Sequence, residues 1–140
     1  MPFILDNSVV TGWFLENQRT AYGDAIAERL QADRAVVPPL WELEFTNVLR
    51  TACLRQRMTA AAAQAVIAQI AMLPIDVDRI STLPSGLLSL ALRFGLSTYD
   101  AAYLELALRL QLPFATVDGA LMEAALASGV GVAPASAAQP

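Results

Sequence analysis

The acidic residues of this chain that could do chemistry lie next to apolar segments. Asp6 ends a short apolar run at the start of the chain, and Asp118 follows another, Phe114–Val117. Such runs are typical of buried strands, and ligands of open α/β sheets bind at the carboxyl ends of strands. Both acids also precede a predicted helix, so helix capping is a simpler alternative for each of them.

Further acidic positions lie within predicted helices. Asp100 comes three residues after Ser97, a position in the first helical turn where an acid is favourable in any protein. It nevertheless leads into an almost wholly apolar stretch. Glu42 and Glu44 are about 200° apart on one helix and cannot share a site, whereas Glu44 and Asn47 share a face. Helical spacing alone does not choose between the two glutamates.

Carboxylates that lie close together need a counter-ion. Two of them ~4 Å apart repel by about 4 kcal/mol at an effective dielectric of about 20, so a cluster of three or four is unfavourable unless a cation lies between them. Oxygen ligands suit Mg²⁺ or Mn²⁺. Such an ion can ionise water and bind a phosphate oxygen, so we expect hydrolysis of a phosphodiester bond.

The residue types that are missing narrow the chemistry further. The chain has no His and no Lys, all 9 basic residues are Arg, and Cys53 is the single cysteine. Imidazole-based triads, Cys/His zinc sites, the P-loop lysine and internal disulfides are therefore excluded. A net charge of −4 argues against a nonspecific nucleic-acid binder. It still allows a nuclease with an acidic metal site and a local arginine patch.

Short apolar strands alternate with helices along the chain. We predict strands at 2–5, 35–37, 74–78 and 114–117, with Gly129–Ala133 as a candidate fifth strand. Helices are predicted at 9–15, 20–31, 40–57, 60–73, 82–95, 99–110 and 119–127. The alternation predicts an α/β fold with a central parallel sheet of four to five short strands covered by helices. We expect a single domain over residues 1–133 and a disordered tail at 134–140.

Composition also bears on location and self-association. The first ten residues lack a basic stretch and include Asp6, so we do not expect them to act as a signal peptide. No apolar run reaches the ~18 residues of a membrane span, so we expect the cytoplasm and no membrane. With 56% hydrophobic and 16% charged residues, the chain has more apolar surface than one core hides, which predicts a homodimer.

Four segments carry a resemblance to a known family. Each contains one of the acids or leads to it, and together they span nearly the whole chain: Phe3–Ser8, Val37–Asn47, Tyr99–Ala107 and Phe114–Asp118. In this order and at this spacing they resemble the PIN-domain ribonucleases, and most closely the VapC-type branch of bacterial toxins. The resemblance implies a PIN-like three-layer fold with a central parallel sheet.

The resemblance also assigns the site residue by residue. The catalytic acids of the family fall on Asp6, Glu44, Asp100 and Asp118, of which Asp6, Asp100 and Asp118 would bind the metal. The supporting polar residues fall on Ser8, Asn47 and Thr116. A Glu-x-x-Asn element of the family matches Glu44 and Asn47, which selects Glu44 over Glu42.

The resemblance further implies a Mg²⁺- or Mn²⁺-dependent endoribonuclease that cleaves RNA, forms a homodimer and is inhibited by a VapB-type antitoxin. The acidic balance supports an alternative, a non-catalytic PIN-like module that binds an antitoxin with weak or no cleavage. Arg50, Arg55 and Arg57 could contact RNA phosphates or the antitoxin, although a solvated helix end is the simpler interpretation. Aspartate-nucleophile phosphotransferases of the haloacid-dehalogenase kind and response-regulator receivers need a Lys, which is absent.

Overall fold

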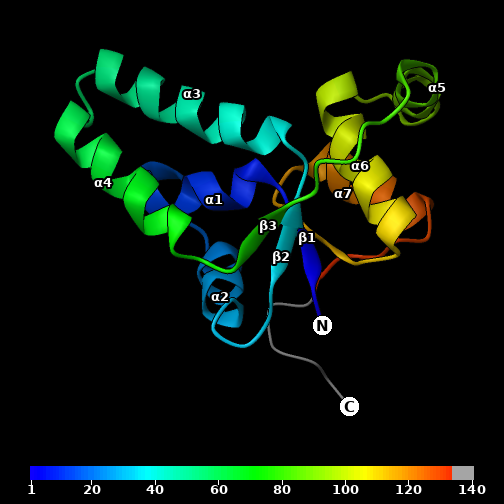
Figure 1. The fold of residues 1–140 in the computed structure, drawn as a ribbon, viewed down its shortest axis with the longest axis horizontal. Helices are drawn as coiled ribbons and strands as arrows, with labels where there is room; N and C mark the ends of the chain where they lie inside the picture. Colours follow the sequence, from blue (N-terminus) through cyan, green and yellow to red (C-terminus); the bar gives the residue numbers. More distant parts are fainter. Residues whose placement is uncertain (134–140) are drawn as a thin grey trace.

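The computed structural model describes residues 1–133. They form a sheet of four parallel strands, ordered β3-β2-β1-β4, with helices on both faces (Figure 1). The strands are β1 (Phe3–Leu5), β2 (Ala35–Val37), β3 (Ile75–Val77) and β4 (Phe114–Ala115). The predicted α/β fold with a central parallel sheet is therefore confirmed.

The helices divide into two layers around the sheet (Figure 1). They are α1 (Asn7–Phe14), the 3-10 turn η1 (Glu16–Gln18), α2 (Ala21–Arg29), α3 (Leu40–Leu54), α4 (Ala60–Ala71), α5 (Pro84–Phe94), α6 (Thr98–Leu110) and α7 (Gly119–Ala127). In Figure 1, α1–α4 lie on one side of the sheet and α5–α7 on the other. No helix within residues 1–133 has both the length and the apolar character to cross a membrane.

Most predicted elements form, with shifts at their ends. The candidate fifth strand is reduced to one parallel bridge between Val132 and Phe114. Strand β4 ends at Ala115, two residues earlier than predicted, and the side chain of the next residue, Thr116, bonds to Asp6. The helix predicted to reach residue 57 ends at Leu54, since the chain turns at residue 56 with a φ of 58°. The predicted tail, 134–140, lies outside the described residues.

The strands are buried because helices cover both faces of the sheet. Phe3, Ile4 and Leu5 of β1 are fully buried, as are both residues of β4. All four strands run parallel, so their carboxyl ends meet at one edge of the sheet. Asp6 and the Thr116–Asp118 segment follow the two adjacent strands β1 and β4, and the fold therefore places them side by side.

Candidate active site

Asp6 is the most buried acid of the site, with 5% of its surface exposed. It precedes α1, but its side chain does not cap that helix. Instead, its Oδ2 accepts hydrogen bonds from Ser8 Oγ at 2.6 Å and Thr116 Oγ1 at 2.9 Å. The capping interpretation is therefore wrong for Asp6, and two hydroxyl groups from separate segments hold its carboxylate in one orientation.

Ser8 and Thr116 also accept hydrogen bonds from the backbone that follows β4. The N–H of Val117 donates to Ser8 Oγ at 3.2 Å, and the N–H of Asp118 donates to Thr116 Oγ1 at 3.0 Å. A hydroxyl group has a single hydrogen, and in each case it is directed at the carboxylate. The two hydroxyls thus connect Asp6 to the segment that carries Asp118.

Glu44, on α3, is held by a residue of α6. The hydroxyl of Tyr103 donates to Glu44 Oε1 at 2.5 Å, and Tyr103 is fully buried. Burial and the adjacent Glu44 raise the pKa of the Tyr103 hydroxyl well above its usual range, so it remains a donor. Sequence reasoning missed Tyr103; the available signal was a tyrosine within an apolar helix, whose buried hydroxyl needs a partner.

Asp100 and Asp118 lie at the starts of α6 and α7. The N–H of Asp100 donates to the capping Ser97 Oγ at 3.1 Å, while the carboxylate itself is half-buried. Asp118 is exposed and accepts a hydrogen bond from the N–H of Leu121 at 2.9 Å, so it does cap its helix. The capping alternative thus holds for Asp118, which leaves its second oxygen, Oδ2, available for another partner.

The four acids interact electrostatically. Burial raises the pKa of Asp6, and the charges of Asp100 and Asp118 raise it further, against the lowering effect of its two hydroxyl donors. Burial also raises the pKa of Glu44, followed by Asp6 and Asp100. The pKa of Asp100 is raised by burial and then by Asp118. The four acids therefore face one region, to which four separate segments of the chain contribute.

No arginine neutralises this cluster within residues 1–133: every ion pair there involves other acids. The donor set consists of oxygen atoms alone, which suits a hard divalent cation. Asn7, next to Asp6, adds a buried Oδ1 that no donor reaches in the described chain. These features fit a divalent metal ion.

The side chains of the four acids are not arranged as a set of metal ligands in this structure. Among residues 1–133, no group of three or more acidic or cysteine side chains is arranged to hold a metal ion. Glu44 is turned to Tyr103, and Asp118 to its own helix. Binding of one ion by Asp6, Asp100 and Asp118 therefore requires side-chain rotation, and it stays a prediction.

Asn47 is placed differently from the acids. It is exposed, one turn after Glu44 on α3, and no hydrogen bond in the described part of the chain joins it to the four acids. It lines a groove of about 210 Å³ together with Gln18, Arg55 and Arg57. The structure therefore associates Asn47 with a neighbouring surface rather than with the carboxylates.

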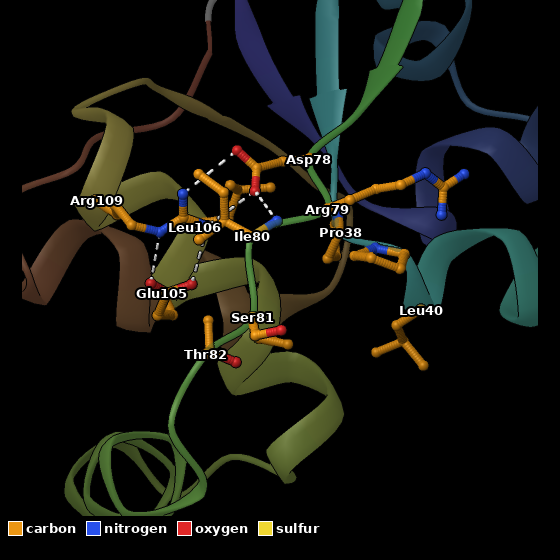
Figure 2. Close-up of a pocket in the computed structure, with 12 residues that line it drawn as sticks. Pro38, Leu40, Asp78, Arg79, Ile80, Ser81, Thr82, Glu105, Leu106 and Arg109 are labelled. Carbon is orange, nitrogen blue, oxygen red and sulfur yellow. Dashed lines mark hydrogen bonds and ion pairs between the residues drawn. The ribbon is translucent and has the colours of Figure 1, made fainter.

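Figure 2 shows a second charged cluster, which includes Glu105 and Arg109 of α6. At about 100° per residue these two lie about 140° and 180° around the helix from Asp100. Arg109 bonds to Glu105 on its own helix at 2.8 Å and to both oxygens of Asp78 at 3.2 and 3.3 Å. These residues line a cavity of about 250 Å³. Burial raises the pKa of Asp78, but Arg109 and a hydrogen bond from the backbone N–H of Ile80 together outweigh it, and the net shift is downward.

Comparison with known proteins identifies the fold family. The family model of the PIN domain matches residues 3–126, which include all four acids. This chain belongs to the PIN domain family. PIN domains are generally nucleases that act on nucleic acids with divalent metal ions. No curated protein matches the sequence.

The fold of this PIN domain also matches a solved structure. The crystal structure of PAE2754 from Pyrobaculum aerophilum superimposes with a TM-score of 0.68, over 89% of this chain and 84% of that one. The two sequences are 21% identical. At this identity the match supports the fold, while the chemistry of this PIN domain has to be argued from its own residues.

Proposed function

We propose that this PIN domain is an endoribonuclease toxin that hydrolyses RNA phosphodiester bonds with Mg²⁺ or Mn²⁺ and is inhibited by a VapB-type antitoxin. One observation carries the proposal. Burial and the charges of neighbouring acids raise the pKa of Asp6, Glu44 and Asp100, and no arginine within residues 1–133 forms an ion pair with these three acids or with Asp118. Such an arrangement is costly unless a cation is bound. An inactive module would gain stability by losing one of these acids.

The proposal gives the residues of the site separate roles in metal binding and in positioning. Asp6, Asp100 and Asp118 would hold the ion, and Ser8 and Thr116 keep Asp6 oriented toward it. A bound Mg²⁺ or Mn²⁺ supplies positive charge next to the phosphate and makes water more acidic.

Glu44 suits the role of general base. Tyr103 occupies its Oε1, so Oε2 is the atom that can accept a proton from an attacking water. Its raised pKa brings it closer to neutrality, where a carboxylate is a better base.

Self-association and the antitoxin belong to the same proposal. Leu83, Leu88, Leu92 and Tyr99 expose between 54% and 76% of their surface on or beside α5. Large exposed apolar side chains that gather on one element favour a protein interface, which supports a homodimer. Light scattering of the purified chain at micromolar concentration tests it. The VapB-type antitoxin rests on the sequence resemblance, and a cytoplasmic location rests on the expected lack of a signal peptide and of a membrane-length apolar run.

The decisive experiment maps new RNA ends in cells after induced expression of the wild type and of Asp6→Asn. We expect new ends at defined positions with the wild type and none with the variant. Purified protein should reproduce these cuts in Mn²⁺ and lose them in excess EDTA. Equal cutting by both proteins would overturn the site assignment. No cutting by the wild type, with or without Mn²⁺, would favour the non-catalytic alternative.

A further inference from the structure

One face of α3 continues from the acidic site toward the far end of the helix. At about 100° per residue, Asn47, Thr51 and Arg55 lie within about 60° of Glu44 around the helix axis. Asn47, Thr51 and Arg55 also line one groove of about 210 Å³. The face that presents Glu44 to the other acids therefore extends along the helix into this groove.

The opposite wall of the groove comes from the end of α1 and from η1. Leu15 and Gln18 line it there, and Arg57 lines it just beyond α3. Gly12 allows this wall to form, because a Cβ at that position would lie 2.8 Å from the carbonyl oxygen of Gln18. The groove thus combines amide, hydroxyl and guanidinium groups with a small apolar floor.

Most of the arginines that form no ion pair within residues 1–133 lie at or just beyond the end of α3, and two of them line this groove. Five of the nine arginines form ion pairs or hydrogen bonds with acids, namely Arg19, Arg29, Arg34, Arg79 and Arg109. Within residues 1–133, no ion pair is formed by Arg50, Arg55, Arg57 or Arg93. Three of these four lie within eight positions at the end of α3, and two of them line the groove. The protein as a whole is acidic, with a net charge of −4, so these arginines form a local positive region on an otherwise negative molecule.

We propose that this groove binds the phosphates of single-stranded RNA that extends from the acidic site, with Arg55 and Arg57 as the phosphate contacts. The proposal rests on the proposed nuclease function and adds the path of the substrate. Eleven residues separate Glu44 from Arg55, a rise of about 16 Å along the helix. A strand stacked at ~3.4 Å per nucleotide covers that distance in about five nucleotides.

The chemistry of the groove favours RNA over a protein partner. Arginine, asparagine, glutamine and threonine side chains supply most contacts to phosphates and sugars, and Gln18, Asn47, Thr51 and both arginines are of these types. The groove begins at Asn47, one helical turn from Glu44 on the same face of α3. A protein that occupied it would bring acidic side chains to Arg55 and Arg57, and the test below includes that outcome.

The test measures RNA binding separately from cleavage. An Asp6→Asn background prevents cutting, and the probe is a fluorescent single-stranded RNA of about 12 nucleotides in Mn²⁺. The test variant adds Arg55→Gln and Arg57→Gln. The control adds Arg50→Gln instead, which removes a free arginine from the same helix at about 120° from Glu44. Thermal melting of each variant confirms that it is folded.

We expect the double variant to bind the probe about tenfold more weakly and the control to bind it unchanged. The salt dependence should also fall, because each lost phosphate contact on a single strand lowers the slope of log K against log salt by ~0.7. Unchanged affinity and slope in the double variant would overturn the proposal. So would an equal loss in the control, since that would indicate a diffuse charge effect.

Cleavage in the wild-type background gives the second readout. RNA of about four nucleotides cannot reach Arg55, so the double variant should cut it like the wild type and cut the longer probe more slowly. If the wild type cuts neither RNA, the proposed function fails while the binding measurements still decide the groove. If the double variant still binds RNA but no longer binds a co-expressed antitoxin, the groove is an antitoxin-binding site and the RNA proposal is wrong.

Discussion

Two clusters of carboxylates occupy opposite faces of α6, and only one of them contains its own cation. Asp78 and Glu105 share Arg109, which lowers the pKa of Asp78 despite its partial burial (Figure 2). On the other face, Asp100 joins Asp6, Glu44 and Asp118 without an arginine, and the pKa of the buried members rises. The carboxylates paired with Arg109 therefore stabilise the fold, whereas the carboxylates of the candidate site carry negative charge that no arginine compensates.

The difference shows how acids with a function can be separated from acids with a structural role. A carboxylate that a guanidinium neutralises is already satisfied within the fold. A buried carboxylate with only hydroxyl donors still favours binding a cation. The comparison makes specific predictions, because each cluster should respond to mutation and to metal in its own way.

The largest effect is expected from Asp6→Asn. RNA cleavage should fall by about 100-fold or more, because the variant loses a negatively charged carboxylate that we propose binds the metal. Without metal, the variant should be as stable as the wild type or more so, since Asn can still accept from Ser8 and Thr116. Thermal melting with and without Mn²⁺, beside a cleavage assay, measures both. Full cleavage and an unchanged metal response would contradict the site assignment.

A smaller loss is expected from Tyr103→Phe. The ring should stay packed beside Phe114, its neighbour at 6.2 Å between ring centroids. Glu44 would lose the hydroxyl that positions it, and a hydrogen bond to a charged group is worth about 1.5–3 kcal/mol. We expect kcat to fall about tenfold with KM for RNA little changed. A wild-type kcat would show that Tyr103 only fills space.

Arg109→Gln should affect stability and leave chemistry intact. Asp78 and Glu105 would lose their cation while remaining partly buried, and we expect a loss of about 1 kcal/mol in the free energy of unfolding. Urea denaturation measures it. Arg34→Gln, which breaks an exposed pair with Asp76, is the matched control and should cost less. A large loss of cleavage in Arg109→Gln would mean that the two clusters are coupled.

The smallest effect concerns pH. The folded-state pKa of Asp6 lies above its ordinary value of 3.8, so its charge destabilises the fold at neutral pH. That destabilisation fades as the pH falls through the raised pKa toward 3.8. In EDTA, Asp6→Asn should therefore gain stability over the wild type at pH 7, and the gain should shrink on acidification. The charge of Asp78 has the opposite effect on stability. Because the pKa of Asp78 is lowered in the folded state, its carboxylate stabilises the fold at neutral pH, and this contribution is lost as the pH falls through the folded-state pKa. A gain that grows on acidification would be evidence against the charge explanation.

Much of the fold follows from local sequence patterns. Short apolar runs alternating with helical periods identify the four parallel strands, and Ser97, Thr59 and Thr20 cap the helices that follow them. The fifth strand could not be settled in this way. Gly129 and Gly131 both adopt positive φ, so the chain turns there, and the run joins the sheet only through a bridge to Phe114 centred on Val132.

The candidate acids were also accessible from sequence, because each lies at the end of an apolar strand or in a segment shared with the family. Their partners were not. Tyr103 and Glu44 are 59 positions apart and meet only when α6 packs beside α3. The hydroxyl of Thr116 reaches Asp6 across 110 positions. Contacts of this kind leave no local pattern, since no short segment contains both groups.

The sequence by itself determined which chemistry was open to this protein: without His or Lys, and with a single Cys, carboxylates and a hard cation remain. It also determined the order of strands and helices, because hydrophobic periodicity is a local property. The tertiary structure alone decided which acids find an arginine. Asp78 meets Arg109 and Asp100 does not, although both sit beside α6, because opposite faces of one helix pack against different elements. Charge compensation is a property of neighbours in space, and only the folded chain assigns those neighbours.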